Sequence, residues 1–337
     1  MSQTQEVIKV EGLTKVYNHS LTAVDHINFS VKRGEIFGFL GPNGAGKTTT
    51  ISMLITVTKP TAGKATILDG DIAKQSMAVR GAIGVVPQEY TADEDLTGNE
   101  NILLCADLYG IPRNVSKKRA DELFKLVELT AFKDKKVRTY SGGMRRRLEL
   151  SCGLINRPKV LFLDEPTLGL DVQTRAATWN YVKMLKKEFG MTLFLTTHYL
   201  EEADALCDRI AIIDHGKIVV TGTPSELKDS LGGDIITLGI QKEDADITSL
   251  ISKVEHVKTV KKENDGYTIK SSNGELTAPL IIEALRKNGH MVTKLSLTKP
   301  TLNEVYLQYT GRSMRDAEES HAGLTAQRMT MRRARSH

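Results

Sequence analysis

The 337-residue sequence is poor in cysteine and in aromatic residues, and it has no long uninterrupted apolar segment. Its three cysteines, Cys105, Cys152 and Cys207, are far apart and form no CxxC pair. Small buried thiols in a reducing compartment are therefore favoured over a metal or redox site. No segment reaches the roughly 18 apolar residues of a membrane-spanning helix, and the start, MSQTQEVIKV, lacks the basic and apolar parts of a signal peptide. We expect a cytosolic protein, or one bound to a membrane from the cytosolic side.

The sequence also has no large excess of charge of either sign, because its formal net charge is only +5. No dense basic stripe accompanies it, so nucleic acid is not expected as a partner. The hydrophobic fraction of 40% and the charged fraction of 26% are typical of a soluble globular protein. At about 150 residues per domain, the length indicates two domains.

Strand and helix patterns alternate through the first two thirds of the chain. Alternating or continuous apolar residues predict strands, and apolar residues three and four positions apart predict helices. The predicted strands are 7–10, 23–31, 35–40, 160–163 and 192–196, with a turn at 15–18. The predicted helices begin near Lys47, fill most of 91–150 and surround 173–189. This alternation predicts an α/β core whose parallel sheet is covered on both faces, with a mostly helical insertion.

A second domain is predicted after Gly232 and Gly233, which mark a boundary. Between 234 and 297 the pattern follows the order strand, helix, strand, strand, helix, strand, which predicts a small ferredoxin-like α+β domain. A further helix, 301–310, ends at a glycine. The charged tail, 313–337, is expected to be disordered. The alternative is a lipid or partner contact through its arginines, Arg332, Arg333 and Arg335.

A phosphate loop lies between a predicted strand and a predicted helix. Residues 41–48, GPNGAGKT, match the pattern GxxxxGK[ST]. Glycines let successive backbone N–H groups surround phosphate oxygens, and the helix N-terminus adds partial positive charge. We expect Lys47 to hold the β- and γ-phosphates of ATP and Thr48 to bind Mg²⁺. The alternative is a glycine-rich surface turn, and the flanking strand and helix count against it.

Two acidic residues follow the apolar strand pattern at 160–163. Asp164 and Glu165 would therefore lie at the carboxyl edge of the sheet, where open α/β sheets bind ligands. Asp164 is suited to position Mg²⁺, and Glu165 is suited to polarise an attacking water. Taken alone, the pair could be a solvated turn. Its place downstream of a phosphate loop favours the catalytic interpretation.

The motif YSGGMRRR, which begins at Tyr140, resembles the LSGGQ signature of ATP-binding cassette (ABC) proteins. Tyr140 and Met144 replace the usual leucine and glutamine, whereas Ser141 and Gly143 are kept. A helix that begins just after Ser141, Gly142 and Gly143 would direct its positive end at an anion. The resemblance implies that Ser141, Gly142 and Gly143 contact the γ-phosphate of a nucleotide held by a second copy of the chain.

The resemblance extends to four single residues outside these motifs. It implies that Tyr17 stacks on adenine and that Gln88 senses Mg²⁺ and the attacking water. It also implies that Asp171 couples one site to the other and that His198 contacts the γ-phosphate. Taken singly, Tyr17 could be a surface aromatic and His198 a satisfied histidine at a strand end. Their order and spacing favour the functional interpretation.

The expected ATPase site therefore has three sets of residues. The catalytic set is Glu165, His198 and Gln88. The Mg²⁺ ligands are Thr48, Gln88 and Asp164. The nucleotide-binding set is Tyr17, Gly41, Pro42, Asn43, Gly44, Ala45, Gly46, Lys47, Thr48, Thr49, Ser141, Gly142, Gly143 and Asp171.

The C-terminal segment KPTLNEVYLQYTGR, residues 299–312, resembles ATPase subunits of the daunorubicin/multidrug-resistance type, which pair with separate ABC-2 membrane permeases. The resemblance implies an ABC cassette at 1–231, with a mostly parallel sheet core, an antiparallel β arm and a helical insertion at about 89–155. An accessory domain at 232–312 would serve regulation or dimer assembly. The chain would form a head-to-tail homodimer at the cytoplasmic face of the membrane, where ATP hydrolysis would drive export of drugs, lipids or glycans.

Two other functions are weighed against this interpretation. The first is a soluble ABC ATPase that acts on nucleic acid or ribosomes. The proteins of that kind that this chain would resemble carry two cassettes in one chain or a long coiled-coil insertion. This sequence has one cassette and no sustained heptads. A non-catalytic nucleotide sensor is disfavoured by the presence of both Glu165 and His198.

Overall fold

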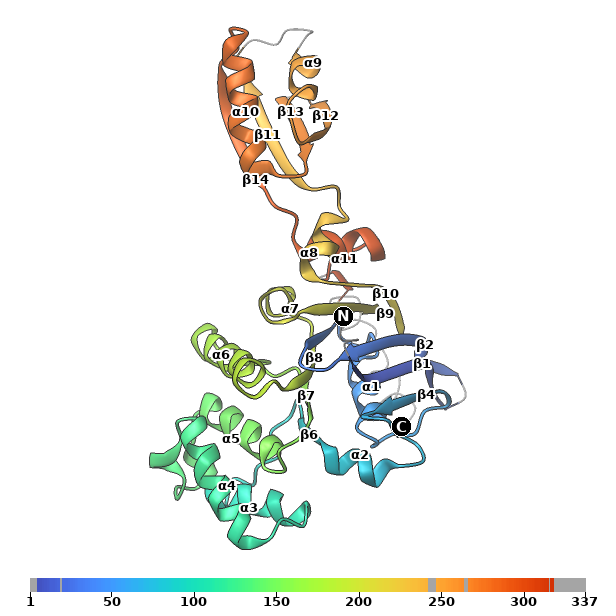
Figure 1. Ribbon diagram of the computed structural model, residues 1–337, viewed down its shortest axis with the longest axis vertical. Coiled ribbons are helices and arrows are strands. Elements are labelled where there is room, and N and C mark those ends of the chain that lie inside the picture. Colours follow the sequence, from blue (N-terminus) through green and yellow to red (C-terminus); the bar gives the residue numbers. More distant parts are fainter. Residues whose placement is uncertain (1–4, 19, 242–246, 264–265, 315, 318–337) are drawn as a thin grey trace, which may run out of the picture. The chain divides into compact units, whose positions relative to one another are not determined.

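The structure is a computed structural model of the chain (Figure 1). It describes residues 5–18, 20–241, 247–263, 266–314 and 316–317. These residues divide into two compact units. The first extends to Thr221 and also includes Met314, and the second is Gly222–Ser313.

A six-stranded sheet forms the centre of the first unit, in the order β10-β9-β3-β8-β7-β6. Neighbouring strands from β9 to β6 are parallel. The strands are β3 Ile36–Leu40, β6 Ile83–Val86, β7 Val160–Asp164, β8 Thr192–Thr197, β9 Arg209–Asp214 and β10 Lys217–Gly222. Every residue of β3, β7 and β8 is buried, as expected of parallel strands covered on both faces. The predicted α/β fold with a mostly parallel sheet is therefore confirmed.

A four-stranded sheet in the order β2-β1-β4-β5, with antiparallel pairing throughout, forms the β arm of this unit. Its strands are β1 Glu6–Tyr17, β2 Leu21–Lys32, β4 Ala62–Ile67 and β5 Gly70–Asp71. The arm shares its core with the parallel sheet, since the ring of Phe29 stacks on that of Phe37 at 5.5 Å between centroids. The predicted turn at 15–18 is wrong in its first part. β1 continues to Tyr17 by pairing with β2, and the left-handed residue is Asn18, with φ 49°.

The helices of the first unit cover the parallel sheet and build the insertion. They are α1 Lys47–Leu54, α2 Ser76–Ala82, α3 Gly98–Leu108, α4 Arg113–Leu126, α5 Gly142–Leu154, α6 Val172–Phe189 and α7 Leu200–Leu206, with short 3₁₀ turns η1 Thr130–Phe132 and η2 Val137–Thr139. In Figure 1, α1 and the β arm lie on one side of the sheet, and α6 and α7 lie on the other.

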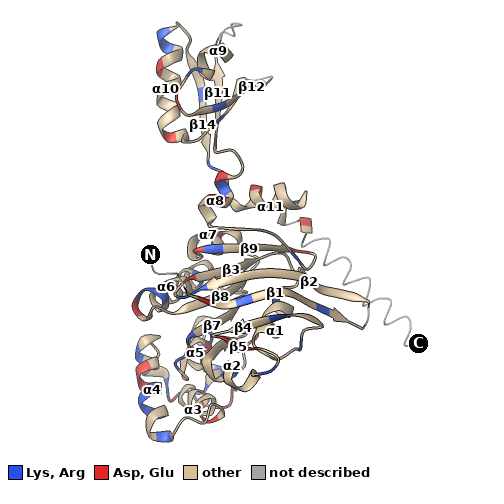
Figure 2. Ribbon diagram, turned by 45° about the vertical axis from the view of Figure 1, so that its right-hand side comes forward, with Lys and Arg blue, Asp and Glu red and all other residues tan. Residues whose placement is uncertain are grey.

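Helices α3, α4 and α5 form the insertion around a core of their own. This core includes Ile102, Phe124, Leu129, Leu148 and Ile155, each fully buried. The outer surface of α4 carries lysine and arginine interspersed with acidic residues rather than a continuous basic stripe (Figure 2). Mixed charge of this kind is typical of a solvated helix face.

The second unit has the element order of the predicted ferredoxin-like domain. Its strands are β11 Asp234–Ile240, β12 Val257–Glu263, β13 Gly266–Ser271 and β14 Val292–Thr298, and its helices are α8 Pro224–Asp229, α9 Ile247–Ser252, α10 Gly274–Lys287 and α11 Leu302–Thr310. The antiparallel sheet has the order β12-β13-β11-β14. The predicted boundary was at residue 232, whereas this unit begins at Gly222 and includes α8, which packs against α11.

The predicted tail, 313–337, is described only at its start. Met314 and Ala317 have buried side chains, which differs from the expectation of disorder at these positions. Residues 318–337, and with them Arg332, Arg333 and Arg335, lie outside the described residues. Among the helices that the structure describes, none is both long enough and apolar enough to span a membrane.

Candidate active site

The phosphate loop joins the carboxyl end of β3 to the start of α1 at Lys47. Two of its glycines are required by their surroundings. A Cβ on Gly41 would lie 2.3 Å from the carbonyl oxygen of Ile213, and a Cβ on Gly46 would lie 2.6 Å from that of Ala23. Gly46 also has a left-handed φ of 109°, which favours glycine. The loop therefore lies against backbone on two sides, with its N–H groups at the N-terminus of α1, as an anion site requires.

Lys47 is held in this loop by oxygen atoms. Its ammonium donates to the carbonyl oxygens of Gly41 and Pro42 at 2.8 and 3.1 Å. It also forms an ion pair with Glu165, at 3.1 Å between Nζ and Oε1. The residue is only 4% exposed. Lys47 and Glu165, which were predicted to act on the phosphate and on water, are thus brought into direct contact.

Asp164 is the last residue of β7 and is buried at the sheet edge. Its Oδ1 accepts a hydrogen bond from the hydroxyl of Thr196, in the neighbouring strand β8. Burial raises the pKa of Asp164 above its ordinary value, although the hydroxyls of Thr196 and Thr48 lower it in part. Asp164 and Thr48 are therefore neighbours, and a buried carboxylate beside a hydroxyl offers the oxygen ligands that Mg²⁺ prefers.

Glu165 follows β7 in a left-handed conformation, with φ 46°. This conformation costs a non-glycine residue about 1–3 kcal/mol, so the surroundings must hold it. The backbone N–H donates to both the carbonyl and the hydroxyl oxygen of Thr196, at 3.1 Å each. Burial alone would raise the pKa of Glu165, but His198 and Lys47 lower it more, so the pKa lies below its ordinary value. Glu165 is therefore an ionised buried carboxylate between two cationic or polar partners.

His198 lies just beyond β8, which places it on the other side of Glu165 from Lys47. Its Nδ1 is 3.2 Å from Oε2 of Glu165, without the alignment of a hydrogen bond. Its ring packs against that of Tyr199, at 4.0 Å between centroids. The guanidinium of Arg175 lies over the Tyr199 ring, at 4.2 Å from its centroid. These contacts fix the imidazole at the mouth of the phosphate loop.

The other predicted residues lie at separate places in the unit. Gln88 is exposed in the loop after β6. Tyr17 ends β1 and is 37% exposed, with the ammonium of Lys15 at 5.0 Å from its ring. An exposed ring at this position can stack on a base, since every base has a flat apolar face.

The signature motif forms the start of α5, so the predicted helix is present, and it begins at Gly142 rather than after Gly143. The Ser141 hydroxyl caps the helix by accepting from the N–H of Met144 at 3.3 Å. Gly143 packs closely on α6, because a Cβ there would lie 2.7 Å from the methyl group of Thr174. Asp171 caps α6 and accepts from the hydroxyl of the same Thr174 at 2.6 Å. Asp171 and the signature are therefore linked through one side chain.

Sequence reasoning missed several buried polar residues that support the site. Arg146 is 3% exposed and Glu149 is 2% exposed, and both face inward from α5. Glu202 in α7 is fully buried and accepts from the hydroxyl of Thr167 and the indole N–H of Trp179, at 2.8 and 2.9 Å. Charged residues within apolar helix faces were the only available signal, and it does not indicate what each residue contacts.

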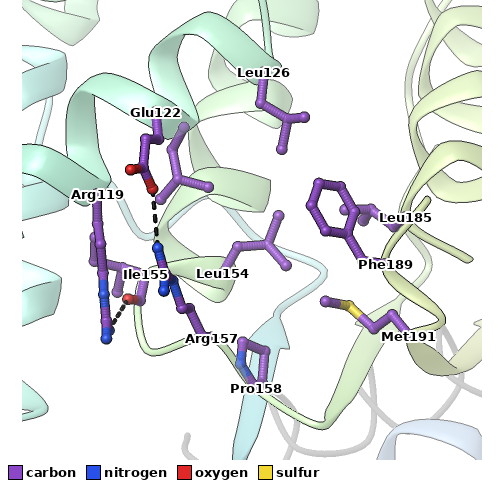
Figure 3. A pocket seen from close by; sticks show the side chains of 11 residues that line it. Arg119, Glu122, Leu126, Leu154, Ile155, Arg157, Pro158, Leu185, Phe189 and Met191 are labelled. Atoms are coloured by element: carbon purple, nitrogen blue, oxygen red, sulfur yellow. Dashed lines mark hydrogen bonds and ion pairs between the residues drawn. The ribbon is translucent and has the colours of Figure 1, made fainter.

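A separate cavity of about 430 Å³ lies between α4, the end of α5, the end of α6 and the start of β8. Figure 3 shows its mostly apolar lining, including Leu126, Leu154 and Phe189, with the Arg157–Glu122 ion pair at 3.1 Å on one side. None of the predicted nucleotide-binding residues lines this cavity. We therefore assign it no part in nucleotide binding.

Comparison with known families gives two matches. A family described as "ABC transporter" matches residues 24–168. A second, described as "ATP-binding protein DrrA1-3-like, C-terminal domain", matches residues 222–310.

Relatives match over nearly the whole chain. The doxorubicin resistance ATP-binding protein DrrA of Mycobacterium tuberculosis (strain ATCC 25618 / H37Rv) is 39% identical over 319 residues, covering 92% of this chain and 95% of that protein. The linearmycin resistance ATP-binding protein LnrL of Bacillus subtilis (strain 168) is 39% identical over 316 residues, covering 92% and 100%. Because both relatives are covered almost end to end, the two units here correspond to a whole relative rather than to a shared module.

Solved structures match about two thirds of the chain. The structure of cbiO1 from Clostridium perfringens, part of an ABC transporter complex, is 30% identical with a TM-score of 0.61, covering 66% of this chain and 90% of that one. A dimeric ATP-binding cassette in a post-hydrolysis state, bound to ADP and Pi, is 28% identical with a TM-score of 0.59, covering 64% and 98%.

Proposed function

This chain belongs to the family of ABC transporter ATP-binding subunits, and from that premise we propose which of its residues bind, position and hydrolyse the nucleotide. Members of the family bind and hydrolyse ATP to drive transport, and these subunits dimerise and work with separate membrane components. The observation that carries the proposal is the contact of Lys47 with Glu165, and of Glu165 with His198, beside the phosphate loop.

The phosphate loop and Lys47 bind the β- and γ-phosphates. The ammonium of Lys47 already binds oxygen atoms of the phosphate loop and of Glu165. When ATP binds, phosphate oxygens replace the carboxylate of Glu165 on this ammonium. Glu165 is then released to accept a hydrogen bond from the attacking water, and its lowered pKa keeps it ionised for this role. His198 donates to the γ-phosphate from the adjacent strand end.

The oxygen donors near the phosphate loop fit a Mg²⁺ ion. Thr48 and Asp164 would hold it, and Gln88 would complete the set from the loop after β6. When bound, the ion supplies positive charge that neutralises the phosphate oxygens during transfer. Tyr17 would stack on the adenine ring.

We expect Mg²⁺-dependent activity to weaken in acid through Asp164. Burial raises the pKa of Asp164, so this group takes up a proton at a higher pH than an ordinary aspartate does, whereas the pKa of Glu165 is lowered by its partners. Protonation removes the charge that attracts the ion. The Mg²⁺ concentration that gives half-maximal phosphate release should therefore increase as the pH falls.

The variant that tests this pH dependence is Thr196→Val, compared with the unsubstituted chain. The hydroxyl of Thr196 stabilises the ionised form of Asp164, so its removal raises the pKa of Asp164 and moves the acid limb to higher pH. The titration of ATP itself is the same in both proteins and cancels in the comparison. Identical acid limbs would contradict the assignment of Asp164.

Two copies of the chain assemble head to tail, so that each ATP lies between the phosphate loop of one copy and Ser141 and Gly143 of the other. The start of α5 supports this arrangement, since a capped helix N-terminus carries partial positive charge. A dimeric solved structure among the similar cassettes supports it as well. Hydrolysis removes the γ-phosphate that both copies contact, and the dimer opens.

The membrane partner is a separate permease of the ABC-2 type, and the chain acts at the cytoplasmic face of the membrane. The names of similar proteins, which concern resistance to doxorubicin and linearmycin, support export of a drug. Purification of the full chain from native membranes tests this proposal. Recovery of a permease with it, together with Mg²⁺-dependent phosphate release, is expected. Recovery of the active chain from native membranes without any co-purifying membrane protein would contradict the transport role.

The permease should dock on α3, close to the loop that carries Gln88. Leu104 and Leu108 are 47% and 81% exposed and lie four residues apart on one face of that helix. A charge at the centre of an apolar interface commonly costs a tenfold loss of affinity or more, about 1.4 kcal/mol upward. Leu108→Glu should therefore release the permease during co-purification and leave phosphate release by the isolated chain unchanged.

The matched control is Met77→Glu in α2, since Met77 is 77% exposed but lies on another helix. This variant should retain the permease. Equal retention by both variants would contradict docking on α3.

A further inference from the structure

Three consecutive arginines follow the signature motif in α5, and each has a different set of partners. Arg145 pairs with Glu94. Arg147 donates to the carbonyl oxygen of Val127 at 3.1 Å, within the helical insertion. Of the three, only the middle residue, Arg146, bonds to the backbone of Pro87 and of residues 164–166, directly beside Gln88 and at Glu165 itself.

The guanidinium of Arg146 binds four backbone carbonyl oxygens. Its Nε donates to Pro166 at 2.6 Å and its Nη1 donates to Pro87 at 2.7 Å. Its Nη2 lies 3.3 Å from the carbonyl oxygens of both Asp164 and Glu165. A planar guanidinium has five N–H groups in a fixed arrangement, so one side chain can bind this many carbonyls where an ammonium cannot.

These bonds act on the catalytic glutamate. The backbone N–H of Glu165 is held by Thr196 of β8, and its carbonyl oxygen is held by Arg146 of α5. The left-handed φ of 46° is therefore fixed from both sides of the residue. This conformation directs the Glu165 side chain towards Lys47 and His198.

The same helix also holds the loop that carries Gln88. Arg146 binds the carbonyl of Pro87, directly before that glutamine. One turn later, the carboxylate of Glu149 accepts from the N–H groups of Thr91 and Ala92, at 2.6 and 2.8 Å. Both ends of the segment 87–92 are thus bonded to α5.

We propose that Arg146 is a positioning residue that couples the signature helix to the hydrolytic loops of its own chain. The inference rests on the proposed head-to-tail dimer, in which Ser141 at the start of α5 contacts the ATP of the other copy. When α5 moves to meet that ATP, Arg146 moves the backbone of 87 and 164–166 with it. Occupancy of one nucleotide site therefore sets Glu165 and Gln88 at the other.

The test compares Arg146→Lys with Arg147→Lys in the full-length chain. Both variants keep the charge and lie side by side in α5, but only the first loses carbonyl bonds to the catalytic loops. For Arg146→Lys, kcat for phosphate release should fall about tenfold or more, because small misplacements of reacting groups are costly. Binding of a fluorescent ATP analogue should stay within about twofold of the unsubstituted chain, since uniform binding is not affected.

Hydrogen exchange gives a readout that does not depend on turnover. In Arg146→Lys, exchange should become faster in peptides that cover 87–92 and 164–168, which include the Leu168 N–H bonded to the Glu165 carbonyl. In Arg147→Lys, faster exchange should be confined to the region around Val127. If the lysine variant does not fold, Arg146→Gln serves instead, because it keeps two donors and removes the buried charge.

The outcomes separate this inference from the proposed function. A chain that neither releases phosphate nor dimerises with ATP contradicts the proposed function, and the exchange comparison still decides the role of Arg146. Unchanged kcat, or unchanged exchange in both loops, overturns the inference. It is also overturned if Arg147→Lys reproduces every effect of Arg146→Lys, since the defect would then be a general one of α5.

Discussion

Replacement of Glu165 with glutamine should lower kcat for phosphate release about 10²-fold or more, which is the usual contribution of a positioned general base. The amide has nearly the same shape, so the left-handed backbone and its bonds to Thr196 are retained. The charge that opposes the γ-phosphate is removed, and ATP remains intact between two copies. The variant should therefore accumulate as an ATP-bound dimer.

Phosphate release and the mass of the complex with Mg²⁺–ATP check this prediction in one preparation. The control is Glu201→Gln, which changes an exposed glutamate in the first turn of α7. It should hydrolyse ATP normally and should not be trapped as a dimer. A Glu165→Gln chain that stays monomeric with ATP, in the presence of the permease, would contradict the head-to-tail mechanism.

The parts of the fold that follow from local patterns could be predicted from sequence. The segment from β3 through the phosphate loop to α1 is continuous in sequence, and its apolar run, glycines and helix pattern are all local signals. The start of α5 at the signature is a local signal too, because Ser141 is a good helix cap. By contrast, β4 and β5 are short and exist through pairing with β1 and with each other. No pattern within them indicates that pairing.

The candidate site divides in the same way. The position of Glu165 at the end of an apolar strand follows from local sequence, whereas its left-handed backbone and its contacts with Lys47 and His198 do not. Those contacts join segments that are distant in sequence and depend on the order of the strands in the sheet. Arg146 is the clearest case. Nothing in a run of three arginines indicates which one is buried, because that depends on how α5 packs.

Replacement of Lys47 with methionine should weaken ATP binding roughly ten- to a hundredfold, since a hydrogen bond to a charged group contributes about 1.5–3 kcal/mol. Methionine has a similar length but no charge. It leaves the carbonyl oxygens of Gly41 and Pro42 without their donor, and it leaves Glu165 without its cation. Lys47 is among the groups that lower the pKa of Glu165, so that pKa should also increase. A larger fraction of this water-activating base would then be protonated as the pH falls.

Titration with a fluorescent ATP analogue measures the loss of affinity, and phosphate release at saturating ATP measures the loss of the base. The control is Lys64→Met, which removes an exposed lysine paired with Glu11 on the β arm. Exposed ion pairs contribute little, so this variant should bind ATP as the unsubstituted chain does. Because Lys47 is the ammonium bonded to both the loop and Glu165, the two losses should occur together. Normal ATP affinity in Lys47→Met would contradict the assignment of the phosphate loop.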